Sequence, residues 1–247
     1  LWKETGYYLN LALAVGAYKG LGYGESVGAM ISGEGLDLPD QDILEEASRD
    51  TAAGYQTRAA ALDLLHVMER TGTAPGRLHI PHPYKKYSLQ SGAYEAGIPF
   101  TGHPMIGHDI IYTHPANECA AVGRSAGRDF LTFADTISRI EHGVYLSVGS
   151  AIMSPMIFEK SMSMAQNLAL QRGEAITDHS IIVVDLARSE WDWSKGEPPE
   201  DSSAYYLRFL KSFARMGGNM RYVSMDNREF LSRLQDALED TEHQEES

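Results

Sequence analysis

Three histidines and an aspartate lie close together in one short stretch and are the chain's best candidates for chemistry. They are His103, His108, Asp109 and His114. Imidazole exchanges protons near neutral pH and can also bind a metal. The spacing H-x4-H-D-x4-H therefore supports a substrate pocket or a metal site, although it matches no standard metal-binding signature. A structural interpretation stays open as well, in which the first two histidines cap turns and His114 closes a loop with Pro115.

A second candidate lies where an apolar run meets an expected helix. The run Val144–Val148 ends on Gly149-Ser150-Ala151, and a helix is expected from Pro155. Small residues let a ligand approach the backbone, and the start of a helix offers free N–H groups to a phosphate. The same residues could simply allow tight packing between strand and helix, so both interpretations stay open.

An acidic, aromatic loop follows the clearest strand, residues 181–185. Its candidate binding residues are Asp192, Trp193, Glu197 and Glu200. Carboxylates beside an indole suit a polyamine, which they would hold through charge pairing and cation–π contact. The alternative for each residue is a solvated surface loop.

The middle of the chain resembles the deoxyhypusine synthase family. Members carry a run of the form GDMIFFH, and Asp109-Ile110-Ile111-Tyr112-Thr113-His114 has a similar spacing here. They also carry a strand that ends in LGGGxxKHH before a helix. The matching run here is SVGSAIMS, residues 147–154. The family's nucleophilic lysine is missing, and Ser154 stands at or next to its position. We therefore do not expect deoxyhypusine synthesis, which proceeds through an imine on that lysine.

The resemblance implies roles for several residues. His114 would lie in the substrate site, and Gly107 and Asp109 would line the side that binds a nicotinamide dinucleotide, NAD. The catalytic candidates are His114 and Asp109. Gly107 stands seven residues before His114, one residue off the family's spacing, which leaves its cofactor contact open. Gly149 and Ser150 are further cofactor-binding candidates. The family also has an acidic segment that binds the amines of a polyamine, which implies the same role for the loop around Asp192.

The resemblance also has implications beyond the site. It implies a homotetramer with sites at a dimer interface, and the largely apolar helix expected over residues 7–19 and Trp2 agree with a surface buried in such an assembly. Family members carry an amino-terminal portion that precedes the region matched here. Because the chain opens at Leu1 rather than Met, we expect it to be the carboxyl-terminal part of a longer product.

From residue 98 onward, expected strands alternate with expected helices, a pattern typical of a parallel sheet with right-handed crossovers. The strands are expected at residues 98–101, 110–112, 144–148, 181–185 and 221–223. We predict an α/β fold, a three-layer sandwich with a mostly parallel, Rossmann-like sheet. Residues 1–95 would form a helical section of the same domain, residues 96–238 the sheet section with the ligand site, and residues 239–247 a disordered acidic tail.

The expected topology brings the candidate residues together. The carboxyl ends of parallel strands lie along one edge of a sheet, and ligands bind along that edge. We therefore predict that His114, Asp109, the Gly149-Ser150 turn and the loop around Asp192 meet in one pocket.

Composition limits the possible partners and locations. The net charge of −13 argues against nucleic acid and against an anionic membrane surface. The single cysteine, Cys119, excludes an internal disulfide and favours a reducing, cytoplasmic location. No apolar run reaches the ~18 residues of a transmembrane helix.

Three functions remain open. The first is an NAD-dependent, transferase-like enzyme that acts on an unidentified, amine-containing substrate. The second is a non-catalytic binding or regulatory protein on the same fold. The third is a metal-dependent enzyme that uses His103, His108 and His114.

Overall fold

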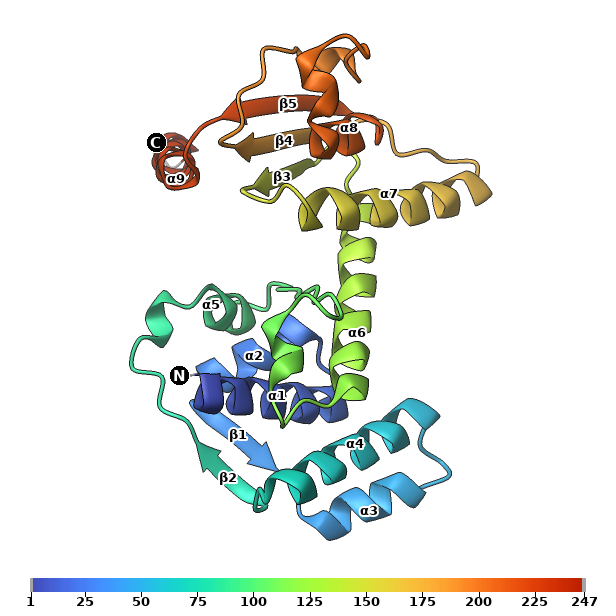
Figure 1. The fold of residues 1–247 in the computed structure, drawn as a ribbon, viewed down its shortest axis with the longest axis vertical. Coiled ribbons are helices and arrows are strands. Elements are labelled where there is room, and N and C mark those ends of the chain that lie inside the picture. The colour runs from blue at the N-terminus through green and yellow to red at the C-terminus, as the bar shows by residue number, and fades with distance from the viewer. Residues whose placement is uncertain (1, 246–247) are drawn as a thin grey trace. The chain divides into compact units, whose positions relative to one another are not determined.

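The computed structural model describes residues 2–245, and the chain folds as two compact units (Figure 1). The first unit runs up to Phe133, and the second begins at Ala134, inside helix α6 (Cys119–Ser138). The boundary expected from the sequence, between residues 95 and 96, falls within the first unit.

The first unit is helical, with one small sheet. Its helices are α1 (Trp2–Lys19), α2 (Tyr23–Ser32), α3 (Gln41–Arg49), α4 (Tyr55–Thr71), α5 (Leu89–Glu95) and most of α6, with the 3₁₀ helices η1 (Lys85–Tyr87) and η2 (Ile110–Thr113). The strands β1 (Gly35–Leu38) and β2 (Gly76–His79) pair antiparallel. These strands bracket α3 and α4 in the sequence, so their pairing closes the α3–α4 hairpin at its base.

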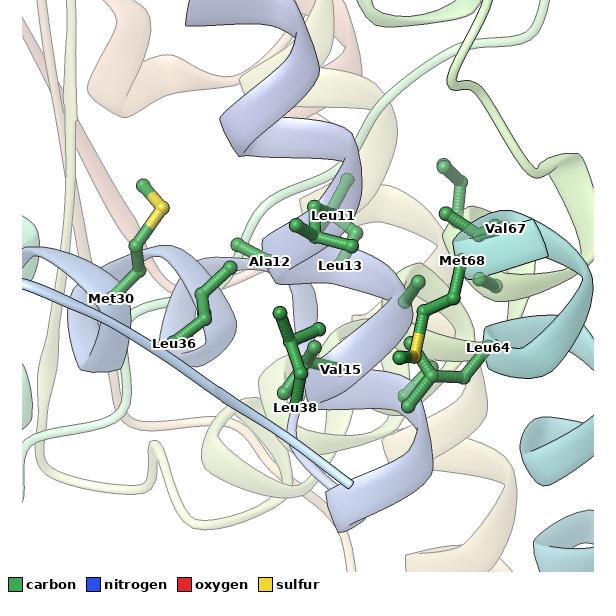
Figure 2. Close-up of a cluster of buried hydrophobic side chains, with 14 of the residues drawn as sticks. Leu11, Ala12, Leu13, Val15, Met30, Leu36, Leu38, Leu64, Val67 and Met68 are labelled. Carbon is green, nitrogen blue, oxygen red and sulfur yellow. The ribbon is translucent and has the colours of Figure 1, made fainter. Parts of the chain in front are cut away.

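Helix α1 is apolar on most sides because it forms the centre of this unit. Leu11 and Leu13 are fully buried between α2, α4 and β1, and Figure 2 shows their neighbours from those elements. Each fully buried leucine contributes about 1.5–3 kcal/mol to stability. The chain's own residues cover this helix. Its apolar character therefore gives no support to an oligomer surface, contrary to the interpretation made from the sequence.

The second unit contains the α/β part of the fold. Strands β3 (Val144–Val148), β4 (Ser180–Asp185) and β5 (Asn219–Ser224) form a parallel sheet in the order β3-β4-β5. The connecting helices are α7 (Met153–Gln171) and α8 (Arg208–Ala214), with the 3₁₀ helices η3 (Trp193–Lys195) and η4 (Ser203–Tyr206) before α8. The predicted α/β class is confirmed, as are three of the predicted strands.

Helices α7 and α8 pack on one face of this sheet. The Tyr145 ring of β3 stacks on Phe158 of α7, with 4.2 Å between centroids, and lies 5.9 Å from Phe213 of α8. On the opposite face, Val144 and Leu146 keep 61% and 37% of their surface exposed. The sheet is therefore well covered on one side, whereas its β3 edge is open on the other.

Two predicted strands are wrong. Residues 98–101 form an irregular segment, and residues 110–112 lie in η2. In the first segment Ile98 N–H donates to the Ala93 carbonyl at 2.9 Å, and Gly102 N–H, just after the segment, donates to Asp129 at 2.6 Å. In the second segment the Ile111 carbonyl accepts from the side-chain amides of Asn10 and Asn117, each at 3.3 Å.

The acidic end of the chain is also more regular than expected. Helix α9 runs from Asn227 to Glu245, so residues 239–245 are helical rather than disordered. Side chains bond along the helix, from Gln235 to Glu239 at 2.8 Å and from Thr241 to the Ala237 carbonyl at 2.8 Å. Residues 246–247 lie outside the described part. Within residues 2–245, none of the helices combines the length and apolarity needed to span a membrane.

Candidate functional site

The predicted site residues fall in both units. His114, Asp109 and Gly107 belong to the first unit, and Gly149, Ser150 and the acidic loop to the second. The topological argument for a shared pocket required residues 110–112 to be a strand of the parallel sheet, and they lie in η2 instead. The shared pocket therefore stays a prediction without that support.

His114 connects a loop to the first helix. Its Nδ1 accepts from Ala116 N–H at 3.0 Å, so the other ring nitrogen, Nε2, carries the hydrogen and donates to the Lys3 carbonyl at 3.0 Å. The ring also meets Trp2 edge-on, with 6.1 Å between centroids. Both ring nitrogens are thus used within the fold, which assigns His114 a structural contact, and a catalytic role for it remains a prediction.

Asp109 and Gly107 lie in an exposed turn before η2. The Asp109 carboxylate accepts from Met105 N–H and so closes this turn. Gly107 has a φ of +83°, a conformation that glycine adopts without strain. A Cβ at Gly107 would meet no atom within 4 Å, so the turn is open to solvent.

The other two histidines, His103 and His108, have different surroundings. His103 Nε2 lies 2.9 Å from Thr101 Oγ1, its ring meets Phe133 edge-on, and burial lowers its pKa. His108 is exposed. Among the residues that the structure describes, no three His, Cys, Asp or Glu side chains come close enough to hold a metal ion. The geometry thus gives the proposed histidine metal site no support.

The Gly149-Ser150 turn lies at the carboxyl end of β3. Gly149 has a φ of +68°, and a Cβ added there would come within 2.2 Å of Asn227 Nδ2, so the Asn227 side chain packs directly on the turn. Ser150 Oγ accepts from Ser154 N–H at 3.0 Å in the first turn of α7. The side-chain oxygen of Asn227, Oδ1, is buried and has no hydrogen-bond partner among the described residues.

Ser154, which replaces the family's lysine, belongs to a cluster of hydroxyl groups. Its Oγ lies 2.7 Å from both Tyr145 Oη and Ser147 Oγ. Burial raises the pKa of Tyr145, so this phenol stays protonated. The cluster offers Ser154 no base that would activate it as a nucleophile. Imine chemistry also needs an amine, which these three side chains do not supply.

The acidic loop is largely paired within the chain. Asp192 accepts from the backbone and hydroxyl of Ser194 and lies 3.5 Å from Lys195 Nζ, contacts that lower its pKa. Trp193 is only 2% exposed, and its Nε1 donates to Ser189 Oγ at 2.9 Å. A buried indole is not available for a cation–π contact with a ligand.

Glu197 is also paired. Arg215 binds it through two hydrogen bonds of 2.9 and 2.8 Å, Lys211 Nζ lies 3.4 Å away, and these partners lower its pKa. Glu200 is exposed, and its carboxylate has no hydrogen bond or ion pair among the described residues. The loop therefore gives little support to a polyamine site.

A cavity of about 520 Å³ in the first unit was not expected from the sequence. It lies between the start of α2, residues 97–101 and the middle of α6, and Glu25, Arg128 and Asp129 are among its lining residues. Asp129 is 3% exposed and accepts from Gly24 and Gly102 N–H groups at 2.9 and 2.6 Å. Burial raises its pKa, and these hydrogen bonds oppose that rise.

The sequence contains one signal for this cavity. Asp129 follows Val122 by seven positions and Ser125 by four, so the spacing places a carboxylate on the buried stripe of α6. A charged residue in such a position needs several hydrogen bonds and is a candidate for a functional site.

Comparisons of this chain with models of known protein families, with curated protein sequences and with solved structures give no match. The resemblance to the deoxyhypusine synthase family is therefore a hypothesis that rests on the motifs quoted above.

Proposed function

We propose that the second unit binds a nicotinamide dinucleotide at the carboxyl edge of its parallel sheet, and that the chain does not form a covalent imine. The observation that carries this proposal is the Asn227 oxygen, a buried acceptor without a partner among the described residues, beside the Gly149 turn. A buried unpaired acceptor costs about 1–3 kcal/mol, and a ligand hydroxyl would remove this cost once the Asn227 side chain turned its oxygen toward the ligand.

The surrounding residues fit such a ligand in part. Gly149 and Ser150 lie between β3 and the first turn of α7, where backbone N–H groups favour an anion. The Gly149 N–H, however, is already used by the Val184 carbonyl at 2.9 Å. The asparagine oxygen would therefore take a ribose hydroxyl, and phosphates would depend on the helix start. When bound, the nicotinamide ring would accept a hydride from a substrate.

Two finer features belong to the same proposal. We infer a Rossmann-like, three-layer arrangement for the second unit, because a parallel sheet is normally covered on both faces and Val144 and Leu146 are open. We also infer a homotetramer from the family resemblance. The exposed Tyr84, Tyr87 and Leu89 of the first unit, at 74–81% exposure, supply apolar surface for it.

Calorimetric titration of NAD⁺ into the chain tests the dinucleotide site. We expect binding by the wild type and a loss of about tenfold or more in Asn227→Ala, because a hydrogen bond to a buried group is removed. Asn219→Ala is the matched control, since this exposed asparagine begins β5 at the opposite edge of the sheet. Absence of NAD⁺ binding, or an equal loss in both variants, would refute the proposal.

A further inference from the structure

The cavity in the first unit is lined by a basic side chain and an acidic side chain that do not form an ion pair with each other. Arg128 and Glu25 both line it, and neither has an ion-pair partner among the described residues. A volume of about 520 Å³ falls in the range of small-molecule sites. Opposite charges left unpaired in one cavity indicate a ligand that carries both signs.

The guanidinium of Arg128 is fixed from behind. Its Nη1 donates to the carbonyls of Ala17 and Leu21, at 3.0 and 3.1 Å, which anchor one edge of the group. Nη2 and Nε make no hydrogen bond within the described part of the chain. Because guanidinium is planar and its orientation is set, these groups can bind a carboxylate through two parallel hydrogen bonds.

Glu25 supplies the opposite charge. Its Oε2 makes one long contact, 3.4 Å from Gly22 N, and the side chain lies at the exposed start of α2. An ammonium group could bind this carboxylate with little competition. The third charged group, Asp129, is already held by Gly24 and Gly102 N–H groups, so it builds the wall rather than receiving the ligand.

Apolar side chains complete the cavity. Tyr94, Ile98 and Leu131 line it and keep 41%, 62% and 60% of their surface exposed. Three large apolar groups left open to solvent beside a cavity would gain stability from an apolar ligand group.

We propose that this cavity binds a small zwitterion of the α-amino-acid type with an apolar side chain. Its carboxylate lies on Arg128, its ammonium group on Glu25, and its side chain against Tyr94, Ile98 and Leu131. The site lies wholly within the first unit and does not depend on the dinucleotide proposed for the second.

The test uses three amino acids, L-leucine, L-methionine and L-phenylalanine, titrated calorimetrically into the full chain. Two analogues of phenylalanine lack one charge each: 3-phenylpropanoate has no ammonium group and phenethylamine has no carboxylate. We expect at least one of the amino acids to bind. The two single-charge analogues should bind at least about tenfold more weakly than phenylalanine itself.

Two conservative variants assign the charges. Glu25→Gln should weaken phenylalanine but leave 3-phenylpropanoate unchanged, whereas Arg128→Lys should weaken phenylalanine but leave phenethylamine unchanged. Leu131→Gln should weaken all apolar ligands, and Leu62→Gln, at a position 52% exposed on α4, is its matched control. Circular dichroism verifies that each variant folds.

Three results would overturn the proposal. The first is that none of the amino acids binds at about 10 mM, a concentration that detects even millimolar affinity. The second is that 3-phenylpropanoate or phenethylamine binds as tightly as phenylalanine. The third is that the cavity variants and the Leu62 control behave alike.

Discussion

Replacing Asp129 by alanine should destabilise the first unit more than any substitution of an exposed acid. The carboxylate accepts from Gly24 and Gly102 N–H groups at 2.9 and 2.6 Å, and so joins the start of α2 and the segment before residue 103 to α6. Without it, two N–H groups lose their partner, at about 1–3 kcal/mol each. Because Asp129 borders the cavity, water can reach part of the space that the carboxylate leaves and bond to one of these N–H groups. We therefore expect the free energy of unfolding to fall by about 2–4 kcal/mol.

Amide hydrogen exchange of residues 11–17, the buried part of α1, measures the free energy of unfolding of this unit. Asp129→Asn keeps one acceptor oxygen and should lose less than the alanine variant. Asp42→Ala, at an exposed position in the first turn of α3, is the control and should cost no more than about 0.5 kcal/mol. A loss in Asp129→Ala of less than about 1 kcal/mol would refute the role given to these hydrogen bonds.

Three further outcomes follow from the structure. His114→Ala should lower the melting temperature of the chain, at a cost of about 1–3 kcal/mol, because Ala116 N–H and the Lys3 carbonyl lose their partner; an unchanged melting temperature would contradict the structural role. Gly149→Ala should destabilise the second unit by about 1–3 kcal/mol in urea titrations, because Gly149 has a φ of +68° and a Cβ there would meet Asn227. Asn227→Ala should restore part of this loss when it is combined with Gly149→Ala, and additive losses would exclude the contact. Burial lowers the pKa of His179, although the nearby carboxylates of Glu141 and Asp178 oppose this shift. Below the ordinary histidine pKa of about 6.5, the unfolded chain therefore binds more protons than the native one. Hydrogen exchange of β4 should therefore show stability falling as the pH drops below this value toward the native pKa, and His179→Leu should remove most of that slope; an equal slope in both proteins would contradict the assignment.

The sheet of the second unit could be predicted from sequence because its strands are continuous apolar runs. Val144–Val148 has the expected bounds, and the other two strands extend the expected ones by one or two residues at an end. Helices α7 and α8 cover one face of these strands, and the central strand β4 has Ile181, Val183 and Val184 fully buried, so local sequence and tertiary structure agree.

The runs at residues 98–101 and 110–112 are equally apolar but do not form strands. The Ile111 carbonyl bonds to the side chains of Asn10 and Asn117, and Gly102, just after the first run, bonds to Asp129. Periodicity carries no information about such partners, so the two segments could not be distinguished from strands. The pairing of β1 with β2 was missed for a related reason, because each strand has only four residues and the whole α3–α4 hairpin separates them.

The candidate site could likewise be predicted where it depends on a local run of residues, but not where it depends on contacts between segments. The sequence identified the Gly149 turn, and the structure adds Asn227 beside it, the first residue of α9. The carboxylates of the acidic loop could be counted from the sequence, but their ion pairs with Lys195, Lys211 and Arg215 depend on the local fold. The cavity around Arg128 was missed because it combines three segments that are far apart in the chain.

The most direct test of the proposed function is hydrogen exchange of the chain with and without saturating NAD⁺. The account predicts slower exchange at residues 149–155 and 225–230, which hold the Gly149 turn, the first turn of α7 and Asn227, with no change at residues 97–102 of the first unit. Unchanged exchange at both segments of the second unit, or protection confined to the first unit, would contradict a dinucleotide site at this edge of the sheet.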